Sequence, residues 1–144
     1  MRAVVQRVRE AHVTVGEEIT GRIGVGLLVL LGVGRDDDGA GAKALARRIV
    51  GLRIFDDDEG RMNRSVADVG GSLLVVSQFT LWGDVRAGRR PSWGRAAPAE
   101  EAEPLYREFV AAARAQGLEV AEGRFGADMN VHLVNHGPVT LIFD

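Results

Sequence analysis

Two continuous apolar runs, at residues 26–31 and 73–76, constrain the fold of this chain more than any other feature. Each run has the length of a β-strand and carries apolar side chains in succession, not in alternation with polar ones. A strand of this composition must be covered on both faces, so both runs predict buried strands, and residues 26–31 predict a central one. The sheet therefore needs other elements packed against it.

Polar residues interrupt the second run at its end, where the sequence reads Ser77-Gln78-Phe79-Thr80-Leu81. We expect this segment where a buried strand reaches the edge of the sheet. Catalytic groups are commonly carried by the segments that leave a rigid scaffold at such a place. The segment is therefore the first candidate for a functional site.

Strands and helices alternate along the rest of the chain. Residues 4–8 and 13–15 predict a pair of strands, residues 19–23 predict another, and strand-like sequence returns at residues 118–143. An amphipathic helix is predicted after the acidic residues 36–38 from its i, i+3, i+4, i+7 apolar stripe. That stripe consists of Ala42, Leu45, Ala46 and Ile49.

A second helix is predicted to begin near Pro98 and to end at Gly117. The order of strands and helices predicts an α+β fold with a single domain over residues 1–144. In this fold, curled mixed β-sheets form a barrel-like core, and the two main helices pack outside. The 19 glycines, about twice the usual frequency, fit many tight turns between short strands.

The composition narrows the classes of function. The net charge is −2, whereas surfaces that bind nucleic acid or membranes broadly are normally basic, so we expect no membrane and no DNA partner. The longest apolar run, residues 25–33, is too short to span a bilayer. The absence of cysteine excludes thiol nucleophiles and favours a reducing compartment, so the cytoplasm is the expected location.

One loop containing glycine and proline is locally basic. Arg86, Arg89, Arg90 and Arg95 lie in it together with Trp93. Guanidinium groups match phosphate oxygens, and tryptophan can stack on a base. The loop follows the first candidate segment, so we predict that the four arginines bind RNA. A plain solvated loop is the alternative.

The residues that could bind a metal are few. His132 and His136 share a strand face, but four residues of strand separate them by about 13 Å, too far to bind one ion. His12 is the only other histidine. The acidic run at residues 56–59 lacks the remaining ligands of an EF-hand and predicts a solvated turn. We therefore expect no metal and no cofactor.

A second polar interruption, at Asn135, Gly137, Pro138 and Thr140, falls inside strand-like sequence. Proline cannot donate a hydrogen bond to a neighbouring strand, so a turn or kink is predicted there. Together with the segment that begins at Ser77, it resembles the SQFTL and NxGPxT signatures of the D-aminoacyl-tRNA deacylase family. The similarity also covers residues 1–8, 26–33, 88–92 and 125–129.

The resemblance implies hydrolysis of the ester that joins a D-amino acid to the terminal ribose of tRNA. Such an ester is already reactive, so fixed geometry and a stabilised oxyanion can suffice without a full catalytic triad. Catalytic roles are implied for Ser77, Gln78, Phe79 and Thr80. The main-chain N–H groups around Gln78 and Phe79 are the expected oxyanion donors, and Thr80 is expected to orient other groups, although a nucleophilic role stays open.

The resemblance also implies how mirror-image substrates are distinguished. Met129 and Asn135 are assigned to the substrate pocket. Gly137 and Pro138 are implied to form a cis dipeptide that enters the active site of a partner subunit and fills the space that an L side chain needs. A homodimer with shared active sites follows, and glycyl-tRNA is also expected as a substrate. The ribose 2′-hydroxyl of the substrate is implied to help activate water.

Two other functions remain compatible with the sequence. A non-catalytic tRNA-binding module would use the arginine loop as its contact surface, and the two motifs would be ordinary turns. An editing domain of threonyl-tRNA synthetase type would remove an L-seryl group. That activity needs a pocket open to L side chains, which the Gly137-Pro138 dipeptide argues against.

Overall fold

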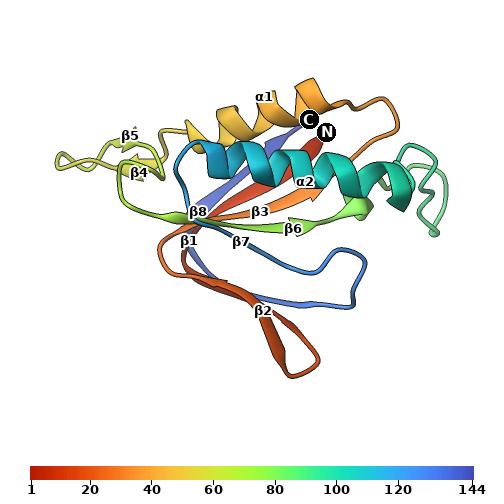
Figure 1. Ribbon diagram of the computed structural model, residues 1–144, viewed down its shortest axis with the longest axis horizontal. Helices are drawn as coiled ribbons and strands as arrows, with labels where there is room; N and C mark the ends of the chain where they lie inside the picture. Colours follow the sequence, from red (N-terminus) through yellow and green to blue (C-terminus); the bar gives the residue numbers. More distant parts are fainter.

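The computed structural model describes all 144 residues and contains one large mixed sheet, a small hairpin and two long helices (Figure 1). In chain order the elements are β1 (Arg2–Val15), β2 (Glu18–Ile23), β3 (Gly26–Gly32), α1 (Gly39–Val50), β4 (Phe55–Asp56), β5 (Met62–Arg64), β6 (Ser72–Ser77), the 3₁₀ helix η1 (Phe79–Trp82), α2 (Ala99–Ala115), β7 (Val120–Glu122) and β8 (Asn130–Phe143). Both long helices lie side by side over one face of the sheet. The predicted α+β class is confirmed.

The large sheet has the strand order β2-β1-β3-β6-β7, and β8 pairs with β1. β6 is parallel to β3 and to β7, whereas β1 is antiparallel to its three partners. The outer strands β2 and β7 approach each other, because the Thr20 hydroxyl donates to the carbonyl oxygen of Glu122 at 3.2 Å and a Cβ on Gly21 would collide with the same backbone. The sheet is thus curled almost into a barrel, as predicted.

Strand β1 corrects one sequence prediction. Residues 4–8 and 13–15 are not paired strands but two halves of a single strand that is 14 residues long. Between them, Arg9 and Glu10 are both exposed, and the register with β8 shifts on either side of Val8. This irregularity breaks the apolar alternation as a turn would, although the chain continues in the same direction.

The bend in β1 separates two hydrophobic cores. Ala3 and Val5 belong to the larger core between the sheet and the helices, whereas Ala11 and Val13 belong to a smaller core inside the curl. The strands β3 and β6 contribute alternate side chains to both cores, and their apolar side chains are almost all buried. The two apolar runs are therefore buried on both faces, as their composition predicted.

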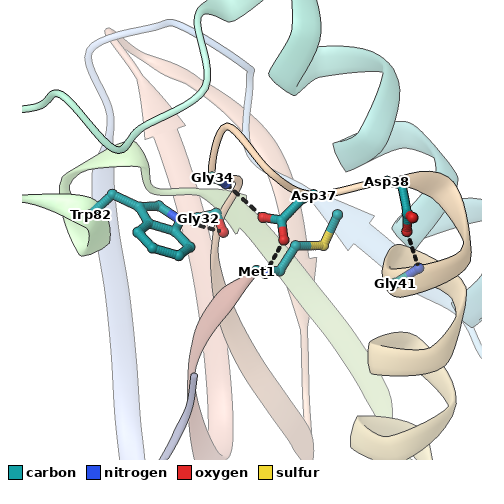
Figure 2. A network of polar contacts seen from close by, with 7 residues as sticks. All are labelled: Met1, Gly32, Gly34, Asp37, Asp38, Gly41 and Trp82. Carbon is teal, nitrogen blue, oxygen red and sulfur yellow. Dashed lines mark hydrogen bonds and ion pairs between the residues drawn. The ribbon is translucent and has the colours of Figure 1, made fainter.

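The predicted helices also form, with defined starts. The Asp38 carboxylate accepts a hydrogen bond from the Gly41 amide at 2.8 Å and caps α1 (Figure 2). Next to it, Asp37 accepts from the Gly34 amide and from the α-ammonium group of Met1. These bonds fasten the loop between β3 and α1 to the start of β1. The α1 stripe at Ala42, Leu45, Ala46 and Ile49 is buried.

The hairpin of β4 and β5 contains the acidic run. The Asp57 carboxylate accepts hydrogen bonds from the amides of Glu59 and Arg61, at 2.9 and 3.0 Å. A single oxygen, Oδ1, accepts both bonds and closes a turn, as the sequence predicted. No three His, Cys, Asp or Glu side chains are grouped so that they could hold a metal ion. None of the helices combines the length and apolarity needed to cross a membrane.

Candidate active site

A hollow of about 500 Å³ lies where β6 ends. Its walls come from the end of β6, from η1, from the start of α2 and from the segment that leads into β8. The lining residues are Val33, Val76, Ser77, Gln78, Phe79, Ala97, Ala99, Ala102, Phe125, Gly126, Ala127, Met129 and Val131. None of them has an ionisable side chain, so the site offers apolar surface, backbone groups and two polar side chains.

The backbone at the end of β6 is held by β3. Ser77 is the last residue of β6 and pairs with Leu31, and the Gln78 amide donates to the carbonyl oxygen of Leu31 at 2.8 Å. The Gln78 amide is therefore occupied, which removes it from the expected oxyanion donors. Phe79 begins η1, and the first amides of a helix have no partner within that helix. The Phe79 amide is the remaining donor of the predicted pair.

Thr80 lies beside the hollow but does not line it. Its hydroxyl oxygen accepts a hydrogen bond from the side-chain amide of Gln78. No histidine or carboxylate is bonded to this hydroxyl, and a nucleophilic hydroxyl needs such a base. The geometry therefore favours Thr80 as the group that orients the Gln78 side chain.

Glycines allow η1 to lie directly on β3. A Cβ on Gly32 would lie 2.8 Å from the carbonyl oxygen of Gln78, and one on Gly34 would lie 2.6 Å from the Trp82 ring. The indole N–H of Trp82 donates to the carbonyl oxygen of Gly32 at 3.1 Å (Figure 2). The sequence prediction missed these glycines and Trp82, because their only signal is contact between distant segments.

Two side chains complete the mouth of the hollow. Phe79 is half exposed, and its ring meets the edge of Trp93 with centroids 5.2 Å apart. Met129 also lines the hollow, and its sulfur accepts a hydrogen bond from the Arg124 amide at 3.4 Å. The structure thus brings Met129 together with Ser77, Gln78 and Phe79.

Asn135 does not line the hollow of its own chain. Its side-chain amide donates to the carbonyl oxygen of Arg7 in β1 at 3.0 Å and to that of Val139, which follows the dipeptide, at 3.1 Å. A Cβ on Gly137 would collide with the Asn135 side chain, so a larger residue there would displace Asn135. In a single chain, Asn135 therefore fixes the dipeptide, and its assignment to the substrate pocket stays a prediction.

A buried arginine holds the same segment from the other side. Arg7 is 5% exposed, and its guanidinium donates to the carbonyl oxygens of His136 and Ile54, at 2.9 and 2.6 Å. The peptide bond of Gly137–Pro138 is cis, and β8 continues beyond it as a strand. The interruption is therefore a kink within one strand, not a turn between two.

The Gly137–Pro138 dipeptide lies far from the hollow of its own chain. It stands beside Arg7 of β1, and Arg7 aligns through β3 with Leu73 of β6. Ser77 lies four residues further along β6. With about 3.3 Å per residue and about 4.8 Å between strands, the separation along the sheet is roughly 20 Å.

The four predicted RNA-binding arginines differ in their surroundings. Arg86 forms a two-pronged ion pair with Asp84, at 2.9 and 2.6 Å, which holds the pKa of that carboxyl far below its usual range and raises the pKa of Arg86. Arg95 stacks over a tryptophan ring. Arg89 and Arg90 are exposed and form no ion pair. Arg86 is thus the least available of the four for a phosphate.

The histidines lie away from the hollow. His12 of β1 and His132 of β8 are cross-strand partners whose rings stack in parallel with centroids 4.3 Å apart. Partial burial lowers the pKa of His12, and the neighbouring charges of His132 and Arg22 lower it further. The sequence prediction compared only His132 with His136 and missed this pair, because β1 and β8 are distant in sequence.

Solved structures define the class of fold. One titled "c-Myc DNA Unwinding Element Binding Protein" has a TM-score of 0.93 and 42% sequence identity, and the match covers 100% of this chain and 98% of the other. A second, titled as a probable eukaryotic D-amino acid tRNA deacylase, has a TM-score of 0.82 and covers 99% and 97%; at 20% identity it supports the fold alone. The chain therefore has the fold of the tRNA deacylases.

Sequence relatives then define the family. The family described as D-Tyr-tRNA(Tyr) deacylase matches residues 4–144. A D-aminoacyl-tRNA deacylase of Symbiobacterium thermophilum is 60% identical, over 100% of this chain and 95% of the relative, and one of Thermosipho africanus is 56% identical, over 100% and 97%. The chain belongs to the D-Tyr-tRNA(Tyr) deacylase family, as its two motifs implied.

Proposed function

We propose that this chain hydrolyses the ester bond of D-aminoacyl-tRNA and releases free tRNA and the D-amino acid. The observation that carries this proposal is the hollow at the end of β6, which combines Ser77, Gln78 and Phe79 with apolar walls and no ionisable side chain. An activated acyl ester is a substrate that such a site can serve, because positioning and oxyanion stabilisation supply most of the acceleration.

In the proposed reaction, water attacks the ester carbonyl carbon, and the bond from that carbon to the ribose oxygen breaks. The Phe79 amide donates to the developing oxyanion, while Ser77 and the Gln78 side chain hold the substrate. Thr80 keeps the Gln78 amide in place through its hydroxyl. The ribose 2′-hydroxyl takes part in activating the water, and the proton that the water loses is delivered to the leaving ribose oxygen.

Rejection of L-aminoacyl-tRNA is assigned to Gly137–Pro138 of a partner subunit. The separation of roughly 20 Å along the sheet between this dipeptide and Ser77 of the same chain supports an arrangement in trans. Large apolar side chains on β8 are exposed, which supports burial of part of this strand in a homodimer. They are Leu133, Val134 and Ile142.

The proposed gate, the Gly137–Pro138 dipeptide, rejects a substrate by occupying the volume that an L side chain needs. It does not have to contact the side chain of a substrate that is accepted. Glycyl-tRNA is therefore a second substrate, since glycine has no side chain to collide with the dipeptide. Residues 1–144 act as one deacylase domain under this proposal. Because charged tRNA is used by ribosomes, the proposed place of action is the cytoplasm.

A single deacylation assay tests the activity and the gate. The purified protein is incubated with D-Tyr-, D-Asp-, glycyl- and L-Tyr-tRNA, and loss of each ester is compared with its spontaneous hydrolysis. We expect rapid loss of the first three and no enzymatic loss of L-Tyr-tRNA. Rapid loss of the L ester would overturn the gate, and tight binding of all four without turnover would favour the non-catalytic tRNA-binding module.

A further inference from the structure

Two guanidinium groups stack over the ring of Trp82, the last residue of η1. The guanidinium carbon of Arg2 lies 4.2 Å from the centroid of the ring, and that of Arg95 lies 4.9 Å from it. Stacking of this kind leaves the N–H groups of the Arg95 guanidinium free to bind an anion. Neither arginine was needed to build the hollow at the end of β6.

The stack is rigidly supported by the main chain. The Trp82 indole donates to Gly32, and Gly34 leaves no room for a side chain beneath the ring. Arg2 also donates to the carbonyl oxygen of Leu81 at 3.0 Å. The tryptophan is therefore a fixed platform that holds two cations in place.

A small hollow of about 170 Å³ opens beside this platform. It is bordered by Trp82, Arg95, Arg35 and the loop between β3 and α1. Arg35 is fixed at its rim, because its Nε donates to the carbonyl oxygen of Gly94 at 2.7 Å. This hollow is separate from the one lined by Ser77 and Phe79.

The charges around the small hollow favour an anion. Asp37 is already neutralised by the α-ammonium group of Met1 and by the Gly34 amide (Figure 2). Arg35 and Arg95 form no ion pair, and only the carboxylate of Asp36 opposes them. Two guanidiniums against one free carboxylate give a local positive charge on a protein whose net charge is negative.

We propose that Arg35 and Arg95, beside Trp82, bind the backbone phosphate that precedes the aminoacylated nucleotide of the substrate. This inference rests on the proposed function, since it places the terminal nucleotide at Phe79. η1 is a single turn, so Phe79 and Trp82 lie about 6 Å apart along its axis, which suits consecutive positions of one strand. Guanidinium groups bind phosphate oxygens in pairs of parallel hydrogen bonds.

Two substrates separate this role from a purely structural one. The wild type and an Arg35→Gln, Arg95→Gln double variant are assayed with D-Tyr-tRNA and with D-tyrosyl-adenosine, an ester that has no preceding phosphate. We expect kcat/KM for D-Tyr-tRNA to fall at least tenfold, mainly through KM, while the adenosine ester changes less than twofold. The slope of log KM against log salt concentration for the tRNA should weaken by about 0.7, the value expected for the loss of one phosphate contact with a single strand.

A matched control removes two charges elsewhere. An Arg61→Gln, Arg107→Gln variant has the same charge but alters the β4–β5 hairpin and the outer side of α2. It should match the wild type on both substrates. Equal losses on tRNA and adenosine esters in the first variant would mean that the arginines only support η1, and unchanged kinetics on the tRNA would also overturn the proposal.

A binding measurement tests the inference independently of ester hydrolysis. A short RNA with the 3′ sequence of tRNA is titrated into the wild type and both variants. We expect at least tenfold weaker binding in the Arg35→Gln, Arg95→Gln variant alone, and a preference for duplex DNA over this RNA would contradict the proposal. If the wild type hydrolyses neither ester, the proposed function fails, whereas the phosphate site is still judged by this titration.

Discussion

The end of β6 and the Gly137–Pro138 kink of β8 are positioned by different means. The first is held by backbone hydrogen bonds to β3 and by glycines that permit close contact, whereas the second is held by the side chains of Arg7 and Asn135. Backbone support tolerates most substitutions on the surface, but side-chain support depends on single residues. Because the proposed reaction takes place at the end of β6 and the proposed rejection of L substrates at the kink of β8, we expect changes near β6 to alter the rate with every substrate. Changes near β8 should instead alter selectivity.

The largest expected effect tests whether the β6 site lacks a protein base. A D-Tyr-tRNA that ends in 2′-deoxyadenosine should be hydrolysed about 10²- to 10⁴-fold more slowly than the normal substrate, the range for loss of a positioned proton-transfer group. Thr80→Val should lower kcat by less than tenfold, because Thr80 only orients Gln78. Single-turnover rates with both substrates and both proteins measure this. The reverse pattern would identify Thr80 as a nucleophile.

A methyl group at Gly32 should displace the β6 site as a unit. In Gly32→Ala the new Cβ would lie 2.8 Å from the Gln78 carbonyl oxygen and 3.1 Å from the Leu81 Cβ, so η1 must move. We expect a loss of about 100-fold in kcat/KM for D-Tyr-tRNA and glycyl-tRNA alike, with ~1–3 kcal/mol lower stability. Gly24→Ala is the control, since no atom lies within 4 Å of its Cβ. Normal turnover in Gly32→Ala would show that η1 has no role in positioning.

Loss of a side-chain support should act on selectivity. Asn135→Ala removes two hydrogen bonds that hold the Gly137–Pro138 segment, so unfolding in urea should require ~1–3 kcal/mol less free energy. The ratio of D-Tyr to L-Tyr ester hydrolysis should fall about tenfold while the D rate is kept, equivalent to ~1.4 kcal/mol. Asn130→Ala, at an exposed position of the same strand, is the control. An unchanged ratio with lowered stability would separate Asn135 from the gate.

The smallest expected effect is on stability in acid and concerns the β8 region alone. The pKa of His12 is lowered in the folded protein from 6.5 by partial burial, His132 and Arg22, against a smaller opposing effect of Glu10. The unfolded chain therefore binds more protons in this range, and stability falls as the pH drops below about 6.5. Urea midpoints at pH 7.5 and 5.5 measure the loss. His132→Gln should reduce it, and an equal loss in that variant would exclude the stacked pair as the cause.

The sequence predicts the β6 region better than the β8 region, for a physical reason. The apolar run at residues 73–76 marks a buried strand because every residue in it needs cover, and the polar Ser77 marks its end. Likewise, the spacing of apolar residues is enough to predict α1 and α2, because a helix face is defined by neighbours in the sequence. These are local properties.

The rest depends on contacts between distant segments. Asn135 bonds to Arg7, 128 residues away, and the Gln78 amide is occupied by Leu31 of another strand, so neither partner has a local signal. The same is true of the stacked His12 and His132, and of Gly32 beneath η1. The two halves of β1 were wrongly predicted as paired strands. That they form one strand is evident only from their pairing with other strands, and both halves pair with β8.

The pairing of β1 with β8 has a consequence for synthesis of the protein. β1 emerges from the ribosome first, but the strand that covers its outer edge begins only at Asn130. Throughout elongation this edge offers unpaired backbone groups, which are templates for association with other chains. A ribosome that stalls before residue 130 therefore leaves a fragment in which this edge of β1 stays unpaired, and we expect such fragments to aggregate or to require a chaperone until they are degraded.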